Sequence, residues 1–140
     1  MKTNIEKLTM PNKSKDLNLK VAVFIVATFA ACAVRFTVSY SDLDVDAQTK
    51  IWLGVSLLAG IAGGLIYRKS FPVAGLIATA GFAVAILARI VFDLIFIDPT
   101  SHNLLPFELV MWSVMAFIPA LAGAFLSSMI LRLLNKKGST

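Results

Sequence analysis

Hydrophobic residues follow one another along this chain in four long runs separated by short polar connections. The runs cover residues 21–40, 51–67, 73–97 and 109–134. Apolar runs of about 18 or more residues are typical of helices that cross a bilayer. The shortest run would measure roughly 25 Å as a helix, at the lower limit of that class. The pattern predicts an all-α, polytopic membrane protein, a four-transmembrane-helix bundle.

The polar ends of the chain carry too little apolar surface to fold alone. We therefore predict a flexible cytoplasmic tail over residues 1–17 and a transmembrane domain over residues 18–135. Residues 136–140 are predicted to form a second, short cytoplasmic tail.

Composition agrees with this class, because 58% of the residues are hydrophobic and 15% are charged. Soluble proteins average about 45–50% apolar and 25% charged residues. The bilayer is thus the first predicted partner of the chain.

The net charge of +5 reflects topology rather than a nucleic-acid partner. Ten of the thirteen Lys and Arg residues precede the first run, lie between the second and third runs, or lie at the end of the fourth run and beyond it. The other two connections carry only Lys50 as a base, against five acidic residues. Basic loops remain on the cytoplasmic side. We predict a multi-pass protein of the cell (inner) membrane with both termini in the cytoplasm and no nucleic-acid partner.

The two halves of the chain resemble each other. "AVRFTVSYSD" in the first run resembles "LARIVFD" in the third, which places Arg35 and Arg89 54 positions apart. "LAGIAGGLIYRK" in the second resembles "LAGAFLSSMILR" in the fourth at an offset of about 63. Two tandem helical hairpins, related by an axis along the membrane normal, are one explanation. Chance similarity between apolar segments is the other.

Small residues recur at helical spacing in the second and fourth runs. Such faces let helix backbones approach closely in lipid. The predicted helix-packing residues are Ser56, Gly60, Gly64, Ala116, Ala120 and Gly123. The faces could pair within one bundle or between protomers, so a homo-oligomer or a larger membrane complex is also predicted.

Arg89 and Asp93 interrupt the third run and lie four residues apart, on one face of a helix. Ionisable groups inside a membrane segment are costly and point to function. Purely structural roles are the alternative: Arg35 would extend to the headgroups, and Arg89 and Asp93 would neutralise each other. The functional hypothesis is an outward-facing polar pocket with these candidates for substrate or ion binding: Arg35, Arg89, Asp93, Asp98, His102 and Glu108.

The connection after the third run also has a structural explanation. Asp98-Pro99 is expected to end the third helix, and Pro106 with Glu108 suits the start of the fourth. His102 titrates near neutral pH in general, but a single loop histidine is also common as a plain polar residue. The spacing of Asp98, His102 and Glu108 matches no standard metal site. We predict no metal, no cofactor and no catalytic residues.

Three functions remain open. The first is a non-enzymatic accessory or assembly subunit, favoured by short loops and abundant small-residue faces. The second is a small oligomeric transporter or channel that uses the Arg89–Asp93 pair and Arg35. The third is a membrane enzyme with an outward-facing site, in which His102 or Asp93 acts as the base.

Overall fold

The computed structural model describes residues 13–37, 45–97 and 105–137. These residues form four α-helices, α1 (Lys13–Thr37), α2 (Val45–Ile66), α3 (Phe71–Phe96) and α4 (Leu105–Lys137). Each helix is long and apolar enough to cross a membrane. The prediction of an all-α fold with four such helices is confirmed.

The helices extend beyond the hydrophobic runs at their polar ends. α1 begins at Lys13, inside the segment that the sequence analysis assigned to a flexible tail. α2 begins with Asp46 in its first turn, and α4 with Glu108. Acidic side chains near a helix start interact favourably with the helix dipole. Hydropathy therefore locates only the apolar part of each helix and misses the polar turns at its ends.

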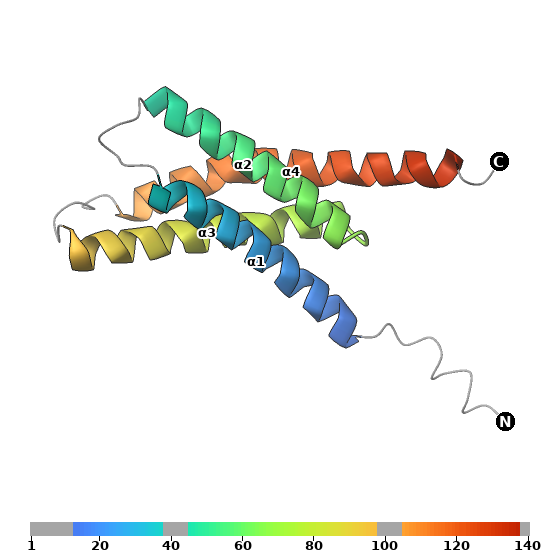
Figure 1. The fold of residues 1–140 in the computed structure, drawn as a ribbon, viewed down its shortest axis with the longest axis horizontal. Helices are drawn as coiled ribbons and strands as arrows, with labels where there is room; N and C mark the ends of the chain where they lie inside the picture. Colours follow the sequence, from blue (N-terminus) through green and yellow to red (C-terminus); the bar gives the residue numbers. More distant parts are fainter. Residues whose placement is uncertain (1–12, 38–44, 98–104, 138–140) are drawn as a thin grey trace.

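Consecutive helices run in opposite directions, and the bundle therefore has two distinct ends (Figure 1). The start of α1, the α2–α3 turn and the end of α4 lie toward one end, which we call the terminal end. The end of α1, the start of α2, the end of α3 and the start of α4 lie toward the other, the arginine end. α2 packs mainly against α4, and α1 against α3, while α3 also contacts α4.

Glycines bring α2 and α4 into backbone contact. A Cβ atom on Gly60 would overlap the carbonyl oxygen of Ala120, and one on Gly123 would overlap that of Leu57. A Cβ on Gly64 would overlap the Ser127 hydroxyl. The absence of side chains at these positions therefore permits the close packing of the two helices.

The contacts between α2 and α4 are reciprocal. Gly60 faces Ala120, and Gly123 faces Leu57. Gly123 lies 63 positions after Gly60, and Ala120 lies 63 positions after Leu57. Adding 63 to an α2 residue therefore gives its counterpart in α4, and each contact is repeated with the two helices exchanged. The seam between α2 and α4 thus has a local two-fold symmetry, at the offset found in the sequence.

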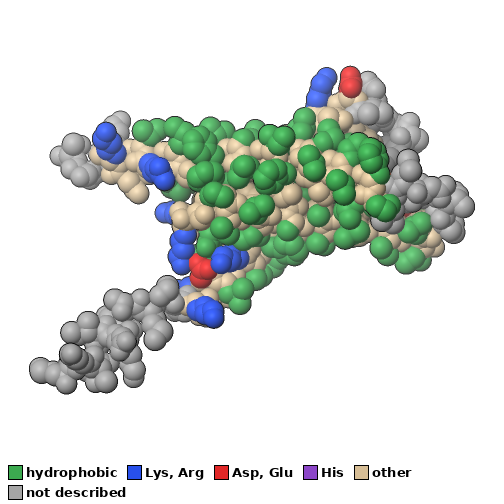
Figure 2. Space-filling model, turned by 180° about the vertical axis from the view of Figure 1, so that it is seen from behind, with side chains coloured by type: hydrophobic (Ala, Val, Ile, Leu, Met, Phe, Trp, Pro, Cys, Tyr) green, Lys and Arg blue, Asp and Glu red, His purple; other side chains and the backbone are tan. Residues whose placement is uncertain are grey.

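The surface of the bundle is largely apolar. Large exposed side chains include Ile25, Phe29, Leu58, Ile95 and Ile118. On the face drawn in Figure 2, hydrophobic side chains cover the middle of the bundle, and most Lys and Arg side chains gather at the terminal end. A soluble protein rarely exposes so large an apolar area.

We expect Gly60→Ala to destabilise the fold and Gly54→Ala to leave it unchanged or stabilise it. Overpacking costs about 1–3 kcal/mol, whereas Gly to Ala in a helix is otherwise favourable by about 1 kcal/mol. A Cβ on Gly54 meets no atom within 4 Å, which makes it the matched control. Melting temperatures of the purified variants in detergent measure the difference. Equal stability of the two variants would contradict the close approach of α2 and α4.

Candidate functional site

The candidate residues that the structure describes lie at the arginine end. Arg35 is in the last turn of α1, Arg89 and Asp93 are in the C-terminal part of α3, and Glu108 is in the first turn of α4. The other two candidates, Asp98 and His102, lie outside the described residues. The helix directions thus bring charges from α1, α3 and α4 to one end of the bundle.

Arg89 and Asp93 form a buried ion pair. The Nε atom of Arg89 donates a hydrogen bond of 3.0 Å to Oδ2 of Asp93 and lies 2.9 Å from Oδ1. The side chains are only 12% and 5% exposed. Their four-residue spacing places them on one face of α3, and that face is turned into the bundle. Mutual neutralisation offsets part of the cost of removing both charges from water.

Two phenylalanine rings lie beside the Arg89 guanidinium. Its central carbon lies 5.2 Å from the centre of the Phe36 ring and 5.8 Å from that of Phe92. The two rings also contact each other edge to face, with their centres 5.5 Å apart. Attraction between a cation and a ring face strengthens when water is excluded. Phe36 belongs to α1, so this contact ties α1 to α3.

The Arg35 guanidinium packs against two tryptophans. Its central carbon lies 4.7 Å from the centre of the Trp52 ring and 4.3 Å from that of Trp112. Arg35 is only 7% exposed. Tryptophan is the strongest ring partner for a cation. The interpretation of Arg35 as a side chain that extends to the headgroups does not fit this burial.

Trp52 links the cluster to the other helices. Its indole nitrogen donates a hydrogen bond of 3.1 Å to the backbone carbonyl of Trp112. Its ring also packs edge to face on Phe82 of α3, with the centres 4.8 Å apart. Arg35, Trp52, Phe82 and Trp112 therefore come from four different helices. With Arg89 and Asp93 they form what we call the arginine cluster.

The sequence analysis did not single out Trp52 and Trp112. They are the two tryptophans of the chain, and each stands near the predicted outer start of its hydrophobic run. The predicted topology places Arg35 at the same depth in the membrane as the two tryptophans. That shared depth was the feature of the sequence that could have indicated the contact. Arg35 packs against aromatic rings, and the expectation that it shares the Asp93 carboxylate stays a prediction.

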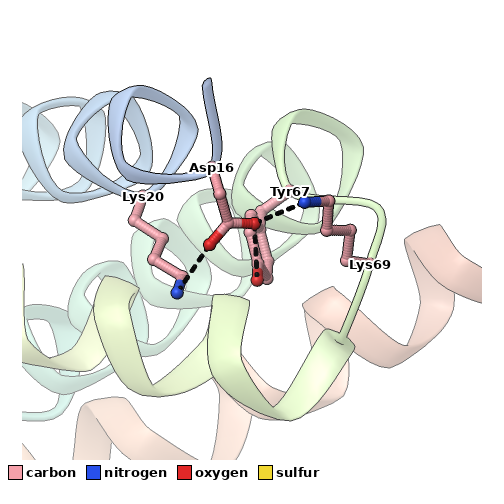
Figure 3. A network of polar contacts seen from close by, with 4 residues as sticks. All are labelled: Asp16, Lys20, Tyr67 and Lys69. Carbon is pink, nitrogen blue, oxygen red and sulfur yellow. Dashed lines mark hydrogen bonds and ion pairs between the residues drawn. The ribbon is translucent and has the colours of Figure 1, made fainter. Parts of the chain in front are cut away.

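A second polar network joins α1 to the α2–α3 turn at the terminal end (Figure 3). Asp16 accepts a hydrogen bond of 2.6 Å from Nζ of Lys69 and pairs with Nζ of Lys20 at 2.8 Å. The Tyr67 hydroxyl donates to the same carboxylate at 3.3 Å. This network, which the sequence analysis also missed, fixes the start of α1 against the turn.

A search for metal ligands finds no group of three or more His, Cys, Asp or Glu side chains within residues 13–37, 45–97 and 105–137. No protein-family model, curated protein or solved structure matches the chain. The functional argument therefore rests on the geometry of the arginine cluster and of the terminal end.

Replacing Asp93 by Asn is expected to lower folded yield sharply. It removes the carboxylate that neutralises Arg89, and breaking one side of a buried ion pair costs about 3–5 kcal/mol. The double change Arg89→Gln with Asp93→Asn removes both charges and should recover much of the yield. Size-exclusion chromatography of fluorescent fusions measures the folded fraction.

Asp46→Asn provides the control, because Asp46 is an exposed acid at the same end of the bundle. It removes only a favourable interaction with the helix dipole, worth about 0.3–1 kcal/mol, so the yield should fall far less than in Asp93→Asn. A double variant that folds no better than Asp93→Asn alone would contradict the coupling between the two charges.

Proposed function

We propose that this chain is a non-enzymatic, multi-pass protein of the cell (inner) membrane that serves as an accessory or assembly subunit. The observation that carries the proposal is the closure of the arginine cluster. Arg35, Arg89 and Asp93 are held by an ion pair and by aromatic rings from all four helices. Such a cluster ties helices together, whereas a transport site must expose its charged groups to substrate.

The apolar surface supports the membrane part of the proposal. Large hydrophobic side chains are exposed along all four helices, and a bilayer would cover them. The distribution of basic residues supports cytoplasmic termini, because they gather at the terminal end (Figure 2). Small-residue faces and the reciprocal seam between α2 and α4 support the duplication of a helical hairpin.

The apolar surface also gives the accessory role its physical basis. In lipid, helices associate through close packing rather than through the hydrophobic effect. α1 is the least buried helix and is therefore available for such an association. Only 17% of the residues in its most apolar 18-residue stretch are buried inside the bundle. A second copy or a helix of another membrane protein can pack there without displacing any contact of the arginine cluster.

A transporter is the second candidate, favoured by the position of Asp93. A buried carboxylate beside an arginine, in an otherwise apolar helix, is common in proton and ion pathways. This function requires that the pair open to water during a cycle. The two proposals therefore differ in a measurable property.

Reconstitution into liposomes distinguishes the two candidates. For the accessory subunit we expect proton and ion leakage equal to that of protein-free liposomes, because the arginine cluster remains closed. A flux that needs the protein and disappears in the folded Arg89→Gln, Asp93→Asn variant would replace the accessory proposal with the transporter. Extraction from native membranes into polymer nanodiscs provides the positive test: the accessory subunit should migrate in a particle containing more than one chain.

The proposed topology is tested with reporter fusions. A green fluorescent protein fused after Thr140 should fluoresce, and an alkaline phosphatase fused there should be inactive, because both termini are expected in the cytoplasm. Fusions in the connection at residues 98–104 should behave in the opposite way. An active phosphatase at the C-terminus would refute the orientation.

A further inference from the structure

A hollow of about 350 Å³ opens at the terminal end, between the α2–α3 turn and the last turns of α4. Its lining carries three cationic side chains, Arg68, Lys69 and Arg132, and no acidic one. Ser70, Ser128 and Asn135 add polar groups. The size falls within the range of about 300–1,000 Å³ that is usual for small-ligand sites. We call it the basic hollow.

Two of the cations are held in place by contacts made by the chain itself. Nζ of Lys69 donates to Asp16 at 2.6 Å, and Nε of Arg68 donates to the carbonyl oxygen of Leu65 at 3.1 Å. The bond of Arg68 uses only Nε, and a guanidinium carries four further N–H donors. Among the described residues, Arg68, Lys69 and Arg132 outnumber the one carboxylate bonded to them, that of Asp16, so this part of the chain gives the basic hollow a net positive charge.

The first turn of α3 adds to this charge. Ser70 occupies the N-cap position without a side-chain capping bond, and Phe71 and Pro72 line the hollow. The N-terminus of a long helix carries a partial positive charge and favours phosphate groups. Here it reinforces three cationic side chains rather than forming a site alone.

Apolar surface continues from the hollow along the bundle. Leu131 and Phe71 belong to the lining, and the Phe71 ring packs against Phe125 of α4 with the centres 5.3 Å apart. Phe125 and Met129 are exposed on the adjoining surface of α4. An occupant with a phosphate and an apolar chain would match both parts of this surface.

We propose that the basic hollow binds a phosphate-bearing anion, supplied by the headgroup of an anionic lipid. Arg68 and Arg132 contact the phosphate from the α2–α3 turn and from α4, and Lys69 exchanges part of its interaction with Asp16 for the ligand. The acyl chains then lie along Phe71 and Phe125. This inference rests on the proposed membrane location, although it does not depend on the accessory role.

The test uses the full chain in a neutral detergent at fixed ionic strength. Dioctanoyl phosphatidylglycerol is the anionic probe, dioctanoyl phosphatidylcholine is the zwitterionic control, and inorganic phosphate is the soluble alternative. Native mass spectrometry counts bound lipids, and the melting temperature follows binding in solution. We expect phosphatidylglycerol to bind and stabilise the protein at concentrations where phosphatidylcholine does not.

The Arg68→Gln, Arg132→Gln double variant should weaken this binding by about tenfold or more, since each cation contributes appreciably to the attraction of anionic lipid. Lys15→Gln, Lys136→Gln is the matched control. It removes the same charge from exposed positions on the first and last helices, outside the lining, and should bind like the unmodified protein.

Equal weakening in both double variants would overturn the proposal, because attraction would then reflect overall charge. Equal binding of the two lipids would do the same. Stabilisation by inorganic phosphate that is lost only in the Arg68, Arg132 variant would support the anion site and assign it to soluble phosphate. Carbonate washing of membranes tests membrane insertion separately, and both double variants should remain in the pellet.

Discussion

The charge of a guanidinium buried among apolar helices loses its hydration, and other groups of the fold must compensate for that loss. At the arginine end this constraint comes from Arg35. Water is largely excluded from a side chain that is 7% exposed. The ring faces of Trp52 and Trp112 lie within 5 Å of its central carbon, and attraction of this kind gains strength where water is absent. Because the two tryptophans belong to α2 and α4, the Arg35 side chain links α1 to both helices.

Arg89 occupies the matching place in the other half of the chain and is compensated differently. It has Asp93 four residues later, whereas Ser39 follows Arg35 at that spacing. Its charge is therefore neutralised within its own helix, with Phe36 and Phe92 covering the guanidinium. If the halves derive from one ancestral hairpin, the arginine was kept while its partner changed. The contacts between α2 and α4 are reciprocal, whereas the two arginines have different partners.

Much of the fold could be predicted from the sequence because hydropathy alone marks a helix that is long and apolar enough to cross a bilayer. Hydropathy was a poorer guide to the helix ends, since Lys13 and Asp46 extend α1 and α2 through polar residues. Local chemistry did better for α4, whose predicted start at Pro106 and Glu108 is confirmed. Arg89 and Asp93 were recognised as a pair because their spacing is local. Trp52 and Trp112 were not, because a contact between a cation on α1 and rings on α2 and α4 depends on tertiary packing. The basic hollow likewise joins residues more than 60 positions apart.

α1 shows how the two ends of the bundle depend on each other. It is the least buried helix: 17% of the residues in its most apolar 18-residue stretch are buried, against 28–39% in the other three helices. Its middle packs on α3 through small residues such as Ala27, which lies near Gly81. Contacts between small side chains constrain the rotation of α1 about its own axis only weakly. The contacts of Asp16 and Arg35 at the two ends of the helix restrict that rotation. Asp16 is bound to Lys69 and Tyr67 at one end, and Arg35 is packed between α2 and α4 at the other. Together these contacts hold one face of α1 toward the bundle, and the opposite face, which carries Phe29 at 78% exposure, forms part of the apolar surface.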